Sequence, residues 1–320
     1  MCITILTIVP QEISSHVSPM NSTAQVDPMP QDWRLHLGVH KTATTHIQEL
    51  LKAAQGSLAE VGTDVVPMEV LRKERIPDLR LRNPHALLGG SLLRGQLTRA
   101  LAPHLTGKST LVMSNEDWMG ASEEALAPVT YPKASRRLGA FLSAVPRHAS
   151  MHLFLAVRRW DAFLPAAYST AIKNLELPFA FEAVRARVMA ETPDWSDVVA
   201  RVLRAAPRAE LTVWPYESYR AKGTEIFSAI TGHSFEVLPD LPPPVATRTP
   251  TQAAISAIEA LPKGLSRGER RKRTFEIWEE TDPAKDGKFA PFSEADQTVL
   301  AARYTQQLEI IAALPRVRFL

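Results

Sequence analysis

The sequence predicts an α/β domain with a central parallel sheet that helices cover on both faces. Two observations support this fold class. From Trp33 onward, short apolar runs alternate with longer stretches of helical periodicity, which is typical of strand-helix-strand units. The chain also has 320 residues, of which 45% are hydrophobic, so a sizeable core can form.

The expected strands are the short apolar runs at 33–38, 63–67, 109–114, 151–157 and 210–216. Helical periodicity predicts helices at 44–55, 86–101, 133–145, 161–174, 179–190, 195–205, 224–231, 250–260 and 293–313. Residues 1–30 are expected to form a flexible tail, and residues 31–320 a single domain. Within this domain, residues 238–320 are expected to be a proline-rich connector and a helical extension.

Composition and charge exclude several classes of function. The formal net charge of +3 is too small for a surface that wraps nucleic acid. The single cysteine, Cys2, excludes an intrachain disulfide framework and fits a reducing compartment or one whose redox state does not matter. A cytoplasmic location is expected. The histidines lack the HExxH spacing, and no metal site is expected. The apolar start of the chain ends well short of the roughly 20 residues that a membrane span needs, so no integral membrane segment is expected.

The stretch HLGVHKTATTHIQELL, residues 36–51, places polar residues between an apolar strand and an amphipathic helix. The helix is expected to begin near Thr44, with threonines that cap its first turn, after a tight turn that Gly38 allows. A helix N-terminus attracts anions because its first N–H groups lack intrahelical acceptors, and Lys41 adds a positive charge. The stretch therefore predicts a phosphate site. The alternative is a capped helix with a solvated lysine.

This stretch departs from the Walker loop, GxxxxGK[ST], of ATP-dependent enzymes. Counting from Gly38, position 43 is alanine instead of glycine, and Lys41 lies in the middle of the loop. The departure weakens the interpretation as a kinase, which remains the alternative enzyme class.

The run HKTATT, residues 40–45, resembles the strand-loop-helix signature PKTGTT or HKTGTT of the sulfotransferase family. In that family the signature binds the 5′-phosphosulfate of the donor 3′-phosphoadenosine-5′-phosphosulfate (PAPS). Two more segments resemble the family in the same order. These are LFLAVRRWDAFLPAAYST, where Arg158 leaves a strand, and LTVWPYESYRAKGTEIFSAITG, where Tyr216 ends one. The resemblance spans residues 33–232, is closest to small bacterial and Golgi carbohydrate sulfotransferases, and implies a P-loop-like three-layer fold.

The resemblance implies a role for each matched residue. The backbone N–H groups of residues 42–45 and the hydroxyls of Thr44 and Thr45 would bind the 5′-phosphate without a metal ion. Arg158 would bind the 3′-phosphate, and Tyr216 and His46 would lie beside the adenine. A family serine is replaced by Ala166, for which Ser169 or Arg159 are candidate substitutes. The expected donor-binding residues are His40, Lys41, Thr42, Ala43, Thr44, Thr45, His46, Arg158 and Tyr216.

Sulfuryl transfer requires a cation and a base. Negative charge grows on the bridging oxygen as the bond to sulfur breaks, and a fixed cation there stabilises the transition state more than the ground state. We expect Lys41 to be this cation. We expect Glu116 to accept the proton of the acceptor, because the run SNEDW follows an apolar strand and resembles a bacterial SSEDL segment. His40 and His104 are alternative bases, and the run NED also fits a helix cap.

The acceptor is expected to bear a hydroxyl or an amine, and the resemblance alone favours a carbohydrate or glycolipid. The basic stretch KGLSRGERRKR, residues 263–273, could contact the donor or an acidic acceptor, whereas a solvated surface loop is the more ordinary interpretation. Two other functions remain open, a P-loop kinase that acts on a small molecule and a catalytically silent nucleotide-binding protein.

Overall fold

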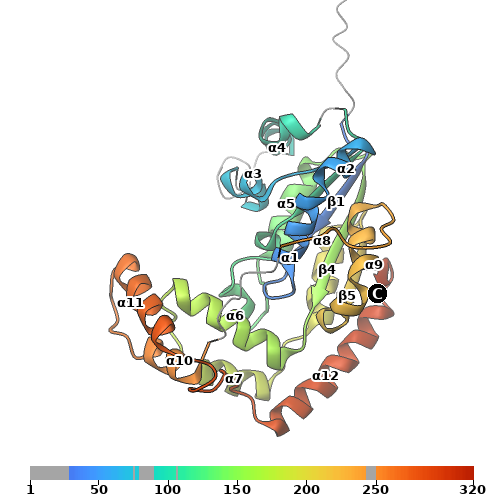
Figure 1. Ribbon diagram of the computed structural model, residues 1–320. Helices are drawn as coiled ribbons and strands as arrows, with labels where there is room; N and C mark the ends of the chain where they lie inside the picture. The colour runs from blue at the N-terminus through green and yellow to red at the C-terminus, as the bar shows by residue number, and fades with distance from the viewer. Residues whose placement is uncertain (1–28, 75, 79–89, 106, 243–249) are drawn as a thin grey trace, which may run out of the picture.

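A computed structural model shows an α/β domain around a six-stranded sheet in the order β2-β3-β1-β4-β5-β6 (Figure 1). All pairs of neighbouring strands are parallel, which confirms the predicted fold class. The structure describes residues 29–74, 76–78, 90–105, 107–242 and 250–320. Most of the predicted N-terminal tail, including Cys2, and part of the proline-rich connector lie outside these residues.

Each predicted strand is present with bounds that differ by one or two residues. The strands are β1 (Asp32–His36), β2 (Thr63–Val65), β3 (Thr110–Ser114), β4 (Ser150–Val157), β5 (Glu210–Pro215) and β6 (Val317–Phe319). β6 was not predicted, because three residues with an arginine in the middle carry no apolar run. It pairs with β5 and extends the sheet.

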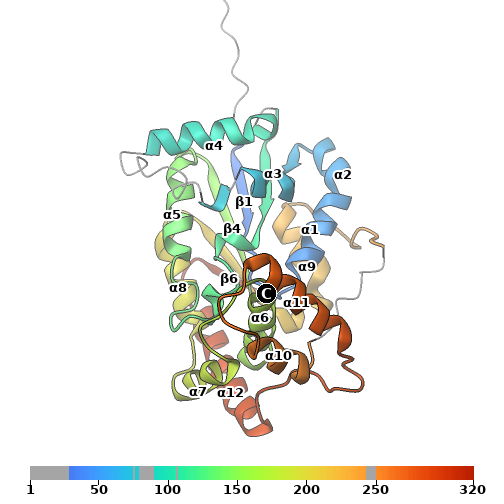
Figure 2. The same cartoon turned by 90° about the vertical axis from the view of Figure 1, so that its left-hand side faces the viewer.

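The helices overlap those predicted and add three. They are α1 (Thr44–Ala53), α2 (Gln55–Glu60), α3 (Met68–Lys73), α4 (Gly90–Leu105), α5 (Ala134–Ala144), α6 (Trp160–Asn174), α7 (Phe181–Ala190), α8 (Trp195–Ala205), α9 (Tyr219–Thr231), α10 (Gln252–Glu259), α11 (Arg267–Glu280) and α12 (Glu294–Ala312). The additional helices are α2, α3 and α11. Figure 2 shows α11 in front of α6, and α11 also packs against α10.

Helix α11 corrects the interpretation of residues 263–273 as a surface loop. Ser266 caps the helix by accepting a hydrogen bond from the N–H of Glu269, an S-x-x-E arrangement that is readable in the sequence. The buried positions Arg270, Thr274 and Trp278 follow each other at four-residue intervals. Two of these three residues are polar, so the buried stripe does not register as apolar periodicity.

Alternating side chains of the strands belong to two hydrophobic clusters, one on each face of the sheet. In β4, Leu153 and Leu155 belong to one cluster and Phe154 and Ala156 to the other. This two-sided burial explains why the central strands are continuous apolar runs. Because the strands are parallel, the loops after β1, β3, β4 and β5 all leave the sheet at its carboxyl edge.

Within the parts of the chain that the structure describes, every helix is too short or too polar to span a membrane.

Candidate functional site

A cavity of about 350 Å³ lies at the carboxyl edge of the sheet. The loops after β1, β3, β4 and β5 contribute to its wall, together with the start of α1 and the middle of α6. Its lining residues are His40, Lys41, Ala43, Thr44, Thr45, Glu116, Arg158, Thr170 and Tyr216. The structure thus brings most of the selected residues together, although they come from distant parts of the sequence. Thr42 and His46 do not line the cavity.

The loop between β1 and α1 is held by its own polar groups. Lys41 and Ala43 have φ values of 63° and 64°, in the left-handed region. The hydroxyl of the fully buried Thr42 donates a hydrogen bond to the carbonyl of Val39 at 2.7 Å, and that of Thr44 donates to the same carbonyl at 3.1 Å. These two threonines therefore fix the loop.

The expectation that threonines cap α1 was wrong. The N-cap residue is Ala43, whose methyl side chain cannot accept a hydrogen bond from the first turn of the helix. Since the hydroxyl proton of Thr44 is directed at Val39, Thr45 is the threonine whose exposed hydroxyl can donate to an anion in the cavity.

Gly38 allows a close approach between two loops. A Cβ atom at this position would lie 2.6 Å from Cγ2 of Thr44 and 3.0 Å from the backbone nitrogen of Glu116. The start of α1 and the loop after β3 therefore pack directly against the Gly38 backbone.

The N-terminus of α1 supplies donors for an anion. The first hydrogen bond of the helix runs from the N–H of Ile47 to the carbonyl of Ala43, at 3.0 Å. The N–H groups of Thr44, Thr45 and His46 precede this bond and have no intrahelical acceptor. Burial first, and then the positive charge of Arg158, lowers the pKa of Lys41. Two cations that repel each other at a helix N-terminus favour an anion between them.

Arg158 connects three parts of the site. Its Nη1 atom donates a hydrogen bond to the carbonyl of Lys41 at 2.6 Å, and its guanidinium carbon lies 4.5 Å from the centre of the Tyr216 ring. The Nε atom is buried and has no hydrogen-bond partner among the described residues. The indole N–H of Trp195 donates to the Arg158 carbonyl at 2.8 Å and fixes the backbone there. The guanidinium is thus held in place, and its Nε–H can still donate a hydrogen bond to a ligand.

Glu116 faces the cavity from the loop after β3 and is partly exposed. Its carboxylate accepts hydrogen bonds from Gln48 at 3.2 Å and from Arg72 at 3.1 Å. The alternative interpretation of the NED run as a cap also holds in part, because the side chain of Asn115 accepts a hydrogen bond from the N–H of Asp117. Asn115 thus starts a short 3-10 turn, and Glu116 is directed into the cavity.

The histidines differ in position. His40 lines the cavity, with Nδ1 at 3.1 Å from the hydroxyl of Tyr131, and burial is the main cause that lowers the pKa of its imidazole. His104 lies elsewhere and pairs with Asp64 at 2.7 Å. His46 is exposed and contacts the hydroxyl of Tyr219 at 2.8 Å. Of the alternative bases, only His40 lines the cavity.

The candidate substitutes for the missing serine at position 166 are both engaged. The hydroxyl of Ser169 donates a hydrogen bond to the carbonyl of Pro165 at 2.6 Å, and Arg159 forms two hydrogen bonds with Asp161. Tyr168 is buried and donates to Glu259 at 2.6 Å, away from the cavity.

Sequence reasoning missed Thr170, which lines the cavity from α6, and Gln48, which contacts Glu116 from α1. Gln48 lies one helical turn after Thr44 and Thr45, so its place on the cavity side was readable from the spacing. Thr170 gave no such signal, because its position depends on the direction in which α6 leaves the sheet.

The described residues contain no group of three or more His, Cys, Asp or Glu side chains that could hold a metal ion. Comparisons of the chain with protein families, with curated proteins and with solved structures find no match.

Proposed function

We propose that this protein is a PAPS-dependent sulfotransferase with a P-loop-like fold. One observation carries the proposal. Lys41, Glu116, Arg158 and Tyr216, which were selected in separate sequence segments, line a single cavity at the N-terminus of α1. A helix N-terminus flanked by a lysine and an arginine suits a ligand with two phosphate groups.

The residues present fit such a donor. The free N–H groups at the start of α1 and the hydroxyl of Thr45 would hold the 5′-phosphate. Arg158, with an unpaired buried Nε atom, would hold the 3′-phosphate, a group that ATP lacks. Tyr216 contacts the guanidinium through its ring, and the same aromatic ring would lie beside the adenine of the donor.

In the proposed reaction, Lys41 donates a hydrogen bond to the bridging oxygen between phosphorus and sulfur. The bond from this oxygen to sulfur breaks while the acceptor oxygen or nitrogen forms its bond to the same sulfur. Glu116 takes the proton that the acceptor loses, and 3′,5′-adenosine bisphosphate leaves. The ammonium is worth most when the negative charge on the leaving oxygen is greatest, so Lys41 lowers the barrier.

Gln48 and Arg72 orient the base in this scheme. Both donate to the Glu116 carboxylate, at 3.2 Å and 3.1 Å, and hold it at the mouth of the cavity. The Glu116 side chain is itself 24% exposed, so an acceptor can reach its carboxylate from the cavity.

The proposal is tested first by ligand binding. We expect 3′,5′-adenosine bisphosphate to raise the melting temperature without magnesium, whereas ATP with magnesium leaves it unchanged. The opposite pattern would support the alternative of a P-loop kinase. Transfer of labelled sulfate from PAPS to a panel of hydroxyl and amine acceptors then tests activity. Donor binding without transfer to any acceptor would support the alternative of a catalytically silent nucleotide-binding protein.

A cytoplasmic location stays a prediction, and Cys2, which is compatible with it, lies outside the described residues.

A further inference from the structure

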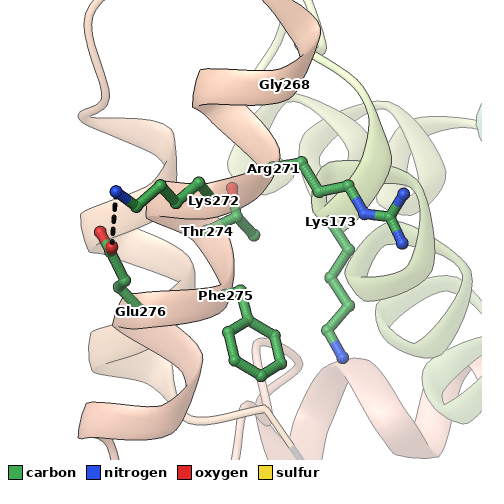
Figure 3. A pocket seen from close by; sticks show the side chains of 7 residues that line it. All are labelled: Lys173, Gly268, Arg271, Lys272, Thr274, Phe275 and Glu276. Atoms are coloured by element: carbon green, nitrogen blue, oxygen red, sulfur yellow. Dashed lines mark ion pairs between the residues drawn. The ribbon is translucent and has the colours of Figure 1, made fainter.

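A second, larger cavity of about 630 Å³ lies between α6 and α11. Figure 3 shows its lining side chains, with Lys173 contributed by α6 and the others by α11. The residues used below are Lys173, Arg271, Lys272, Phe275 and Glu276. The volume is in the range of ligand sites in proteins, about 300–1,000 Å³.

The second cavity is a neighbour of the first along α6. Thr170 lines the first cavity, and Lys173 lines the second. Residues three apart lie on the same face of a helix. Lys41 and Lys173 also repel each other electrostatically. Burial is the main cause that lowers the pKa of Lys173, and the positive charge of Lys41 is the second. A ligand in the second cavity would therefore lie on the face of α6 that also borders the first cavity.

The cavity carries an excess of positive charge. Lys173, Arg271 and Lys272 line it against one acid, Glu276, which lies 3.9 Å from the ammonium of Lys272. In Figure 3, Lys272 turns toward Glu276, whereas Lys173 and Arg271 extend on the other side of α11. Arg271 has no ion-pair partner among the described residues.

Lys173 is held in place but forms no close ion pair with the described residues. Its ammonium lies 3.9 Å from the centre of the Trp278 ring. Glu279 is close enough to raise its pKa, and this is the smallest of the three causes that act on Lys173. Lys173 and Arg271 thus form a pair of cations on facing helices, which suits an anionic group between them.

Phe275 adds an apolar surface beside these cations. Its side chain is 65% exposed, which is unusual for a phenylalanine, and it faces the same space as Lys173 in Figure 3. An exposed aromatic ring beside cations can pack against the apolar face of a sugar while the cations bind its acidic substituent. Most of α11 is exposed around it, so the cavity is open and admits a chain longer than itself.

A third cavity, of about 620 Å³, lies on the α1 and α3 side and shares Thr45 with the first. Its charged lining residues are Glu49, Lys52, Glu69 and Arg72, so the two signs balance. This cavity selects for no ligand charge, in contrast to the one between α6 and α11.

We propose that the cavity between α6 and α11 binds the acceptor, and that this acceptor is an acidic carbohydrate whose carboxylate or sulfate groups contact Lys173 and Arg271. This proposal rests on the proposed function, because it names the acceptor class of that reaction. The binding event itself needs no donor, so it can be measured independently of sulfate transfer.

The test measures the binding of a chondroitin tetrasaccharide and of neutral chitotetraose to the full chain by calorimetry. The double variant Lys173→Gln/Arg271→Gln removes the two facing cations. Arg273→Gln is the matched control, because Arg273 lies on the same helix, pairs with Glu269 at 3.1 Å and does not line the cavity. Binding of 3′,5′-adenosine bisphosphate to each variant is measured alongside.

The wild-type protein and Arg273→Gln should bind the acidic tetrasaccharide at least about tenfold more tightly than chitotetraose, and the double variant should lose this preference. Nucleotide affinity should change little in the double variant. Equal binding of both sugars, or an acidic preference that survives in the double variant, overturns the acceptor proposal. If the wild-type protein prefers the acidic sugar but does not bind 3′,5′-adenosine bisphosphate, the result counts against the proposed function alone.

Discussion

Nη1 of Arg158 lies 2.6 Å from the carbonyl oxygen of Lys41, and the two residues lie 117 positions apart in the sequence. The hydrogen bond joins the loop after β4 to the loop after β1. The same guanidinium lies 4.5 Å from the centre of the Tyr216 ring, which comes from the end of β5. Arg158 therefore holds together three of the loops that form the candidate donor site.

Replacement of Arg158 by lysine should weaken the binding of 3′,5′-adenosine bisphosphate by about 2 kcal/mol, because an ammonium cannot reproduce the planar, two-pronged donor set of a guanidinium. Isothermal titration calorimetry measures the change. Arg159→Lys is the control, since the Arg159 side chain is engaged with Asp161 outside the cavity. Equal dissociation constants for the two variants would contradict the role of Arg158.

Replacement of Lys41 by alanine should lower the rate of sulfate transfer by about 100-fold or more, because the growing charge on the leaving oxygen loses its cation. The Lys41 side chain forms no hydrogen bond or ion pair with the described residues, so the free energy of unfolding should change by less than about 0.5 kcal/mol. Initial rates and urea denaturation measure the two effects. Lys222→Ala, on the exposed face of α9, is the matched control, and a near-normal rate for Lys41→Ala would refute the assignment.

Replacement of Glu116 by glutamine should lower the rate of transfer by about 100-fold to 10,000-fold, since an amide of the same shape cannot take the proton of the acceptor. The affinity for 3′,5′-adenosine bisphosphate should not change. Glu60→Gln, at the exposed end of α2, serves as the control. Full activity of Glu116→Gln would transfer the role of base to His40, the other titratable group proposed for it that lines the cavity.

Replacement of Ala43 by glycine should raise the free energy of unfolding by about 0.5–1 kcal/mol. At φ 64° an alanine is strained by about 1–2 kcal/mol, and the greater freedom of glycine in the unfolded chain cancels only part of this gain. Ala53→Gly, in the exposed last turn of α1, should instead lower the stability by about 1 kcal/mol. Urea denaturation of both variants should therefore give changes of opposite sign.

The buried His36 should make the protein less stable in acid. Its Nδ1 atom lies 2.8 Å from Oγ of Ser114, its ring stacks on Trp214, and burial lowers the pKa of the imidazole from 6.5 to about 4, although the charge of Glu116 opposes the shift. Between these two values the unfolded chain binds a proton that the folded protein does not, so stability falls as the pH falls.

The variant His36→Gln, which cannot titrate at this position, isolates this effect. Between pH 7 and pH 5 the wild-type protein should lose about 2 kcal/mol more stability than the variant. Urea denaturation at a series of pH values gives both slopes, whatever the absolute stability of the variant. Parallel slopes would show that His36 does not contribute.

The parallel sheet was predictable because its central strands are buried on both faces and therefore read as uninterrupted apolar runs. Strand β6 pairs with β5 through backbone atoms, and this pairing has no counterpart in the pattern of side chains. Helix α11 was hidden for another reason, since the buried face of α11 includes Arg270 and Thr274. Its cap at Ser266 was the signal that could have revealed it.

The residues of the candidate site were predictable where a charged or polar residue lies in the loop that follows a strand, as at Lys41, Glu116, Arg158 and Tyr216. The uses of the threonines were not, because a hydroxyl has equal chemical access to a helix N–H, a ligand or a carbonyl such as that of Val39. His46 is expected beside the adenine, and this stays a prediction; the structure shows that it contacts Tyr219 and does not line the cavity, since the rotation of α1 about its axis decides which side each residue faces.

The missing side chain at Gly38 restricts how this protein can be engineered. A methyl group at this position would lie 2.6 Å from Cγ2 of Thr44 and 3.0 Å from the backbone nitrogen of Glu116. The start of α1 and the segment that carries Glu116 therefore both contact this one backbone position. A mutagenesis library across residues 39–45 should leave position 38 invariant. A larger residue at position 38 would also displace Glu116, the residue that we propose takes the proton of the acceptor.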